Sequence, residues 1–167
     1  MGLDMYLTAE VYIGGAYHEI EPKSISVSNR FKDTNDQKPL IWTTYPTENL
    51  EEIRYRVGYW RKANQIHNWF VKNVQCGKDD CSEYIVDKEE INELLDICKD
   101  LISSKDKDKA LELLPPKEGF FFGLSNPEQE HFWEYYWDDI ELTISNLENA
   151  LEYINKYDAC IKYTSSW

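Results

Sequence analysis

Residues 133–154 have the sequence WEYYWDDIELTISNLENALEYI. Apolar side chains recur in this stretch at every third or fourth position, which is the spacing of one face of an α-helix. That face comprises Trp133, Trp137, Ile140, Ile144, Leu147, Leu151 and Ile154. The stretch predicts the longest helix of the chain. Its start is expected at residues 125–128, where Pro127 follows two capping residues.

The two ends of the chain predict strands. Residues 3–13 alternate apolar and polar side chains, and residues 159–163 form a second apolar stretch that can pair with the first. Shorter strands are predicted at residues 17–20, 24–27 and 84–86, and further helices at residues 51–74, 88–102 and 106–114. We therefore predict an α+β fold, in which a small antiparallel sheet of N-terminal strands plus the C-terminal strand packs against three to four helices, the longest near the C-terminus.

The length of 167 residues, of which 42% are hydrophobic, favours one domain over residues 1–167 with a core of its own. Residues 29–49 are rich in Asn, Asp, Lys, Thr and Pro, and predict a long polar loop. Residues 119–123 hold three phenylalanines between two glycines, so we expect this segment to be buried.

The charge of the chain excludes several classes of partner. Eighteen Lys and Arg residues against 31 Asp and Glu residues give a net charge of −13, which repels the phosphates of nucleic acids and anionic lipids. No apolar run approaches the roughly 20 residues of a membrane helix, and no basic and apolar leader opens the chain. We expect a cytoplasmic protein that binds neither nucleic acid nor membrane.

Known catalytic and cofactor motifs are absent from the sequence. The four cysteines lack the paired spacing of a zinc site, and neither a glycine-rich phosphate loop nor an HExxH motif is present. We therefore expect no metal and no cofactor.

Residues 59–70 contain the side chains best suited to binding. On helical spacing, Asn64 and His67 lie beside the core, where an unpartnered polar side chain costs on the order of 1–3 kcal/mol. In one interpretation they belong to a site where basic side chains meet an anion and a tryptophan stacks on a planar ring. In the other they form an internal network that fixes the helix against the sheet. The candidate ligand-binding residues are Asp4, Trp60, Arg61, Lys62, Asn64, His67 and Trp69.

Two rows of acidic residues recur at helical spacing. They comprise Glu89, Glu93, Asp96 and Asp100 in one helix and Glu134, Asp138, Glu141, Glu148 and Glu152 in the longest helix. Such rows either are the solvated faces of amphipathic helices or imitate the phosphates of DNA toward a host protein.

Several segments resemble a family of uncharacterised proteins encoded by bacteriophages and prophages. The matching segments are MGLDMYL at residues 1–7, YWRKAN at 59–64 with Ile66, His67, Trp69 and Phe70, Asp79-Asp80-Cys81, residues 113–123, and Ser165-Ser166-Trp167. They cover about half of the chain, and residues 29–49 have no counterpart. The resemblance implies a phage accessory gene acting in the host cytoplasm, and it implies no particular activity.

We therefore predict a phage accessory protein that binds rather than catalyses. It would counter or modulate a host defence pathway by sequestering a small anionic, nucleotide-like ligand or by masking a host protein. Two alternatives stay open: an acidic decoy of a host protein, and a small nucleotide-processing enzyme with His67 as general base and Asp4 nearby. Phe132, Tyr135 and Tyr136 lie off the apolar face of the longest helix and indicate a self-association or partner surface, so a homo-oligomer is also open.

Overall fold

The computed structural model describes residues 2–12, 24–28, 42–46 and 52–167. The chain divides into two compact units, one made of Met1–Val11 with Arg54–Trp167 and the other of Tyr12–Ile53. The strand expected at residues 17–20 lies outside the described residues.

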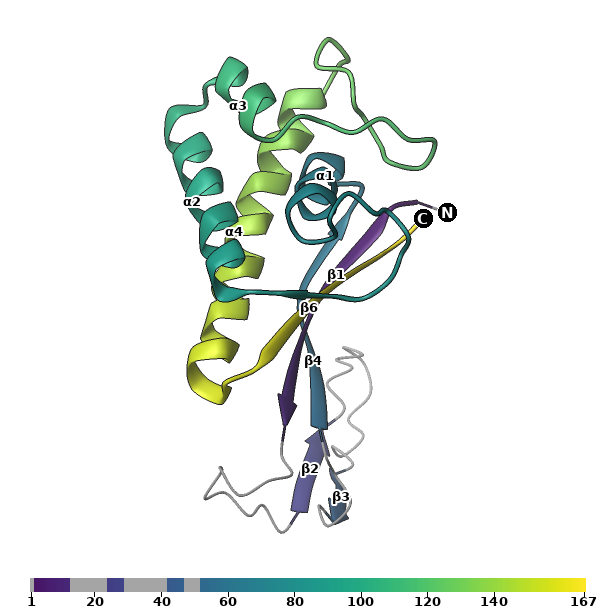
Figure 1. Cartoon of the computed structure of the whole chain (residues 1–167), viewed down its shortest axis with the longest axis vertical. Helices are drawn as coiled ribbons and strands as arrows, with labels where there is room; N and C mark the ends of the chain where they lie inside the picture. Colours follow the sequence, from purple (N-terminus) through teal and green to yellow (C-terminus); the bar gives the residue numbers. More distant parts are fainter. Residues whose placement is uncertain (1, 13–23, 29–41, 47–51) are drawn as a thin grey trace, which may run out of the picture. The chain divides into compact units, whose positions relative to one another are not determined.

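A four-stranded antiparallel sheet forms the centre of the larger unit (Figure 1). Its order is β4-β1-β6-β5, where the strands are β1 (Asp4–Tyr12), β4 (Glu52–Arg61), β5 (Tyr84–Val86) and β6 (Cys160–Ser166). The β1 and β6 strands pair from Asp4 opposite Ser166 to Glu10 opposite Cys160. The first and last strands are therefore neighbours in the middle of the sheet, as the sequence predicts.

Four helices accompany the sheet, and they are α1 (Asn64–Asn73), α2 (Lys88–Ser104), α3 (Lys107–Leu113) and α4 (Phe132–Tyr157). They pack against one face, so that Leu3, Met5, Leu7 and Ala9 are fully buried while the intervening residues of β1 are half-buried. Helix α2 begins with the expected reciprocal hydrogen bonds between Asp87 and Glu90. The predicted α+β fold, with its longest helix near the C-terminus, is confirmed.

The helix predicted over residues 51–74 is wrong in its first half, because residues 52–61 form strand β4 and α1 begins only at Asn64. The β4 segment is rich in aromatic and β-branched residues, which favour a strand. Lys62 turns the chain between the two elements with a φ of 63°. A Cβ at Gly58 would lie 3.1 Å from the Cβ of Asn146, so this glycine permits a close approach of β4 to α4.

The smaller unit contains a two-stranded antiparallel sheet of β2 (Ser24–Ser28) and β3 (Trp42–Pro46). The β2 strand confirms the prediction for residues 24–27. The β3 strand corrects the predicted loop over residues 29–49, because its Trp, two Thr and Tyr residues favour extended backbone. The rest of that loop lies outside the described residues.

Two expectations about residues 119–131 are also corrected. Of the three phenylalanines expected to be buried, only Phe122 is, whereas Phe120 is 95% exposed. Helix α4 begins at Phe132 and not at residues 125–128, because His131 has a left-handed backbone conformation with a φ of 64°, which separates the turn at Asn126 from the helix. No helix among the described residues is long and apolar enough to cross a membrane.

Candidate functional site

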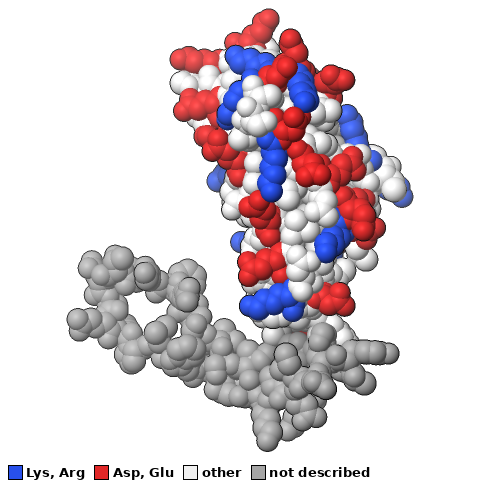
Figure 2. Space-filling view, turned by 90° about the vertical axis from the view of Figure 1, so that its left-hand side faces the viewer, with Lys and Arg blue, Asp and Glu red and all other residues white. Residues whose placement is uncertain are grey.

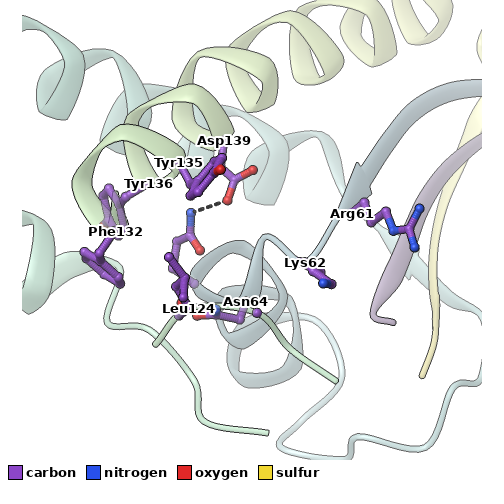
Figure 3. A pocket seen from close by; sticks show the side chains of 10 residues that line it. Arg61, Lys62, Asn64, Leu124, Phe132, Tyr135, Tyr136 and Asp139 are labelled. Atoms are coloured by element: carbon purple, nitrogen blue, oxygen red, sulfur yellow. Dashed lines mark hydrogen bonds between the residues drawn. The ribbon is translucent and has the colours of Figure 1, made fainter. Parts of the chain in front are cut away.

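A pocket of about 460 Å³ lies between the β4–α1 turn and helix α4 (Figure 3). Volumes of this size are typical of pockets for small molecules. Its walls come from segments far apart in the sequence: the turn and the first residues of α1, the 123–124 loop, and α4. The lining residues are Arg61, Lys62, Asn64, Gln65, Gly123, Leu124, Phe132, Tyr135, Tyr136 and Asp139.

The turn after β4 places two adjacent basic residues at the pocket. Arg61 and Lys62 are both exposed, and neither has an ion-pair partner in the part of the chain that the structure describes. Gly123 approaches this turn closely, since a Cβ there would lie 3.0 Å from the Cβ of Lys62, and its φ of +89° also favours glycine. In a chain of net charge −13, two unpaired cations at a pocket form a local site for an anion.

Asn64 holds the loop that closes one side of the pocket. Its side chain is 1% exposed, and its amide nitrogen donates hydrogen bonds to the backbone carbonyls of Phe122 and Leu124, at 3.0 and 2.8 Å. Its amide oxygen accepts a hydrogen bond from the backbone N–H of Lys117 at 3.0 Å. One buried side chain therefore fixes the path of residues 117–124.

Asp139 is the acidic group of the pocket. Its Oδ2 accepts a hydrogen bond of 3.1 Å from Nε2 of Gln65, as the dashed line in Figure 3 marks. Burial raises the pKa of Asp139 to about 7, which the Gln65 hydrogen bond opposes and the neighbouring Asp138 reinforces. This carboxyl group is therefore partly protonated at neutral pH.

His67 lies outside this pocket, in a buried network behind it. Its side chain is fully buried, and its Nε2 lies 3.1 Å from both oxygens of Asp79, which also accepts hydrogen bonds from Lys117 Nζ and Trp167 Nε1. Because an ionised carboxylate only accepts, Nε2 carries the proton, and Nδ1 accepts a 2.7 Å hydrogen bond from the Tyr163 hydroxyl. Asp79 thus joins α1 to the 115–124 loop and to the chain end at Trp167.

The charges of this network follow from the same contacts. Burial lowers the pKa of His67 against the opposing effect of Asp79, so the imidazole is neutral. Burial alone would raise the pKa of Asp79, but the hydrogen bonds from Lys117 and His67 outweigh it, and this pKa lies below its usual value. The internal network expected from the sequence is present, with both ring nitrogens of His67 partnered.

The other predicted binding residues lie apart from the pocket. Trp60 is fully buried and donates a 2.8 Å hydrogen bond from Nε1 to the hydroxyl of Thr143, and Trp69 is a core residue. Asp4 accepts a hydrogen bond from the hydroxyl of Tyr59 on the sheet. Of the seven candidate residues, Arg61, Lys62 and Asn64 line the pocket.

Sequence reasoning missed Gln65, Leu124 and Asp139 as pocket residues. Gln65 is polar but only 3% exposed, because α1 packs against α4. The aromatic residues for which the sequence indicates a self-association or partner surface, Phe132, Tyr135 and Tyr136, line the pocket. Asp139 continues the helical spacing of these residues on the same side of α4, and this spacing could have identified it as a neighbour of the aromatic residues.

The two acidic rows lie on exposed parts of α2 and α4, but lysines interrupt them. Lys99 pairs with Glu148, Lys105 with Glu141, and Lys109 with Asp100. Figure 2 shows this side of the molecule with acidic and basic side chains interspersed. The acidic candidates Glu89, Glu93, Asp96, Asp100, Glu134, Asp138 and Glu141 are all exposed.

Comparison of the chain with family models, with curated proteins and with solved structures gives no match.

The His67 network predicts a moderate stability effect for Tyr163→Phe. This change keeps the ring, which stacks on Phe70 at a centroid distance of 4.0 Å, but removes the hydroxyl donated to His67. An unpartnered buried ring nitrogen is expected to lower the free energy of unfolding by about 1–2 kcal/mol, measured by urea denaturation. Tyr84→Phe is the control, since its hydroxyl contacts Asp80 at the surface. Equal losses in the two variants would contradict a structural role for the His67 contact.

Proposed function

We propose that the protein is a non-catalytic binding protein whose pocket holds a small anionic ligand with a planar ring. The observation that carries this proposal is that basic side chains without ion-pair partners among the described residues and aromatic side chains line the same pocket. Lys62 offers a charge-assisted hydrogen bond to an anionic group, and Arg61 adds a second positive charge nearby. Tyr135, which is 58% exposed, offers stacking surface to a ring, in front of the buried Phe132 and Tyr136.

The volume of the pocket and the rigidity of its loop wall also suit a small ligand. It is about 460 Å³ in volume, and the Asn64 hydrogen bonds hold its loop wall in place without a ligand. A pre-formed wall lowers the entropy lost on binding. The site is therefore suited to holding a ligand rather than only to filling the space between elements.

The resemblance to phage-encoded proteins supplies the setting of the proposal. In an infected cell, a protein with such a pocket counters or modulates a host defence pathway by sequestering a nucleotide-like signal. The protein could fill the same role by masking a host protein, but no feature of the described residues favours masking over the binding of a small ligand in the pocket.

The contacts give less support to the two alternatives. A decoy that imitates DNA needs an unbroken row of negative charge, whereas lysines pair with Asp100, Glu141 and Glu148. A general base needs access to its substrate, whereas His67 is fully buried with both ring nitrogens in hydrogen bonds.

The proposal predicts that Lys62→Ala weakens nucleotide binding at least about tenfold, because one charge-assisted hydrogen bond is lost. Isothermal titration calorimetry with nucleoside mono- and triphosphates at low salt measures the effect. The control is Lys99→Ala, an equal change of charge on α2 at a lysine that pairs with Glu148.

Native mass spectrometry of the protein purified without denaturation adds a second readout, the mass of any retained ligand. Absence of both a retained ligand and nucleotide binding would contradict the proposal. Equal weakening in Lys62→Ala and Lys99→Ala would also contradict it, because it would indicate a general charge effect.

A further inference from the structure

The pocket has a second polar end, away from the basic turn. In Figure 3, Asp139 lies on the α4 side and Arg61 projects away from it, with Lys62 between them. Asp139 has no ion pair with any described residue, and its Oδ1 has no hydrogen-bond partner among them. A carboxyl group with a free acceptor therefore faces the pocket, apart from the two cations.

Gln65 adds a second acceptor at this end. Its Nε2 donates to Asp139, and this contact fixes the orientation of the amide above about pH 7, where Asp139 is ionised and only accepts. Its Oε1 has no partner among the described residues. Asp139 Oδ1 and Gln65 Oε1 are therefore two acceptors at this end of the pocket that the donors of a ligand can reach.

Hydrogen-bond donors from a ligand would stabilise the ionised form of Asp139, which its surroundings disfavour. Burial disfavours its charged form, and neither Arg61 nor Lys62 is among the causes that set its pKa. The other titratable groups that line the pocket are Tyr135 and Tyr136, and burial raises the pKa of Tyr136 well above its usual value. A ligand with N–H groups at this end would stabilise the carboxylate where the protein itself supplies one hydrogen bond.

Among nucleobases, guanine has the matching edge. Its N1–H and its 2-amino group are adjacent donors, which one carboxylate can accept together, with the amide oxygen of Gln65 beside them. Adenine presents an acceptor nitrogen next to its amino group, so it would set an acceptor against the carboxylate. Tyr135, which is exposed and lies one turn before Asp139 on α4, offers the ring a stacking surface.

We infer that the ligand is a guanine nucleotide, whose base is bound by Asp139 and Gln65 and whose phosphate is bound by Lys62, with Arg61 adding positive charge nearby. This inference rests on the proposed function and names the ligand of the same pocket. Asp139 is then the residue that determines base specificity, and Lys62 binds the phosphate of any nucleotide.

The test is calorimetric titration at pH 8 and low salt with guanosine, inosine and adenosine 5′-monophosphates. Inosine monophosphate lacks only the 2-amino group. We expect guanosine monophosphate to bind about tenfold more tightly than inosine monophosphate, and adenosine monophosphate to bind most weakly. Asp139→Asn should weaken the binding of guanosine monophosphate at least tenfold and change the affinity for adenosine monophosphate by less than about threefold. Lys62→Ala should weaken the binding of all three nucleotides by the same factor.

Two adverse outcomes are distinguishable. Binding of all three nucleotides with equal affinity, weakened by Lys62→Ala but not by Asp139→Asn, overturns the guanine inference and leaves the proposed function standing. Binding of none by folded wild-type protein, with no ligand mass retained, overturns both. Circular dichroism of each variant confirms that a loss of binding is not a loss of fold.

Discussion

The variant Asn64→Ala is expected to lose about 2–4 kcal/mol of unfolding free energy. The change leaves the backbone N–H of Lys117 and the carbonyls of Phe122 and Leu124 without their partner. Each unpartnered buried group costs on the order of 1–3 kcal/mol, and part of that cost is recovered where water reaches the loop. Because this loop forms a wall of the pocket, the same variant should also bind ligand more weakly.

Urea denaturation measures the stability change, and hydrogen exchange at the Lys117 amide reports the loop itself. That amide donates to Asn64, so it should exchange faster in Asn64→Ala than expected from the change in global stability. The control is Asn73→Ala, which removes an amide that bonds only within its own helix, to the carbonyl of Trp69. A loss below about 1 kcal/mol in Asn64→Ala, with unchanged exchange at Lys117, would contradict the proposed role.

Local signals in the sequence were enough for most of the fold. The cap at Asp87 and the end of α3 before Pro115 each depend on neighbours within a few residues, and each was predicted correctly. The apolar face of α4 was predicted only in part: Ile140 and Leu147 are buried as expected, but Phe132 and Tyr136, which were placed off that face, are buried as well. The error over residues 51–74 has a local cause as well, since apolar residues of a strand and of the following helix happened to continue one helical spacing across the turn at Lys62.

The site was harder to predict from the sequence than the fold, because its contacts join residues that are far apart in the chain. Asp139 and Asp138 are adjacent and chemically identical in the sequence, yet Asp138 is exposed while Asp139 meets Gln65 from a helix 74 positions away. No local pattern separates the two residues. The burial of Asn64 and His67 was predictable from spacing, but their partners Phe122, Leu124 and Asp79 were not.

The second large effect is expected from Asp139→Asn, which should raise the free energy of unfolding at pH 8 by about 2–4 kcal/mol. Burial raises the pKa of Asp139 from 3.8 to about 7 in the folded protein. Between these two values the folded state binds a proton that the unfolded state has released, so stability falls as the pH rises from about 4 to about 7. A neutral amide removes this dependence and keeps the shape of the side chain.

His67 produces a dependence of the opposite sign in the same range. Its pKa is lowered by burial, so its contribution is present above pH 6.5 and is lost as the pH falls and the unfolded state takes up a proton. The pH dependence of the unfolding free energy of the wild-type protein therefore does not separate the contribution of Asp139 from that of His67. The difference between wild type and Asp139→Asn does, because His67 contributes equally to both.

Urea denaturation of both proteins from pH 4 to pH 8.5 provides that difference. We expect the advantage of Asp139→Asn to be smallest near pH 4, to grow up to about pH 7 and to level off above it. The matched control Asp138→Asn makes the same change in net charge at the neighbouring exposed residue, and should shift stability by less than about 0.5 kcal/mol at every pH. A pH-independent difference, or the same curve for both variants, would mean that Asp139 is ionised at low cost in the folded protein. A pH-dependent advantage in Asp139→Asn alone would mean that the protein holds an acid in the pocket at the expense of stability, as expected where a ligand donates hydrogen bonds to that acid.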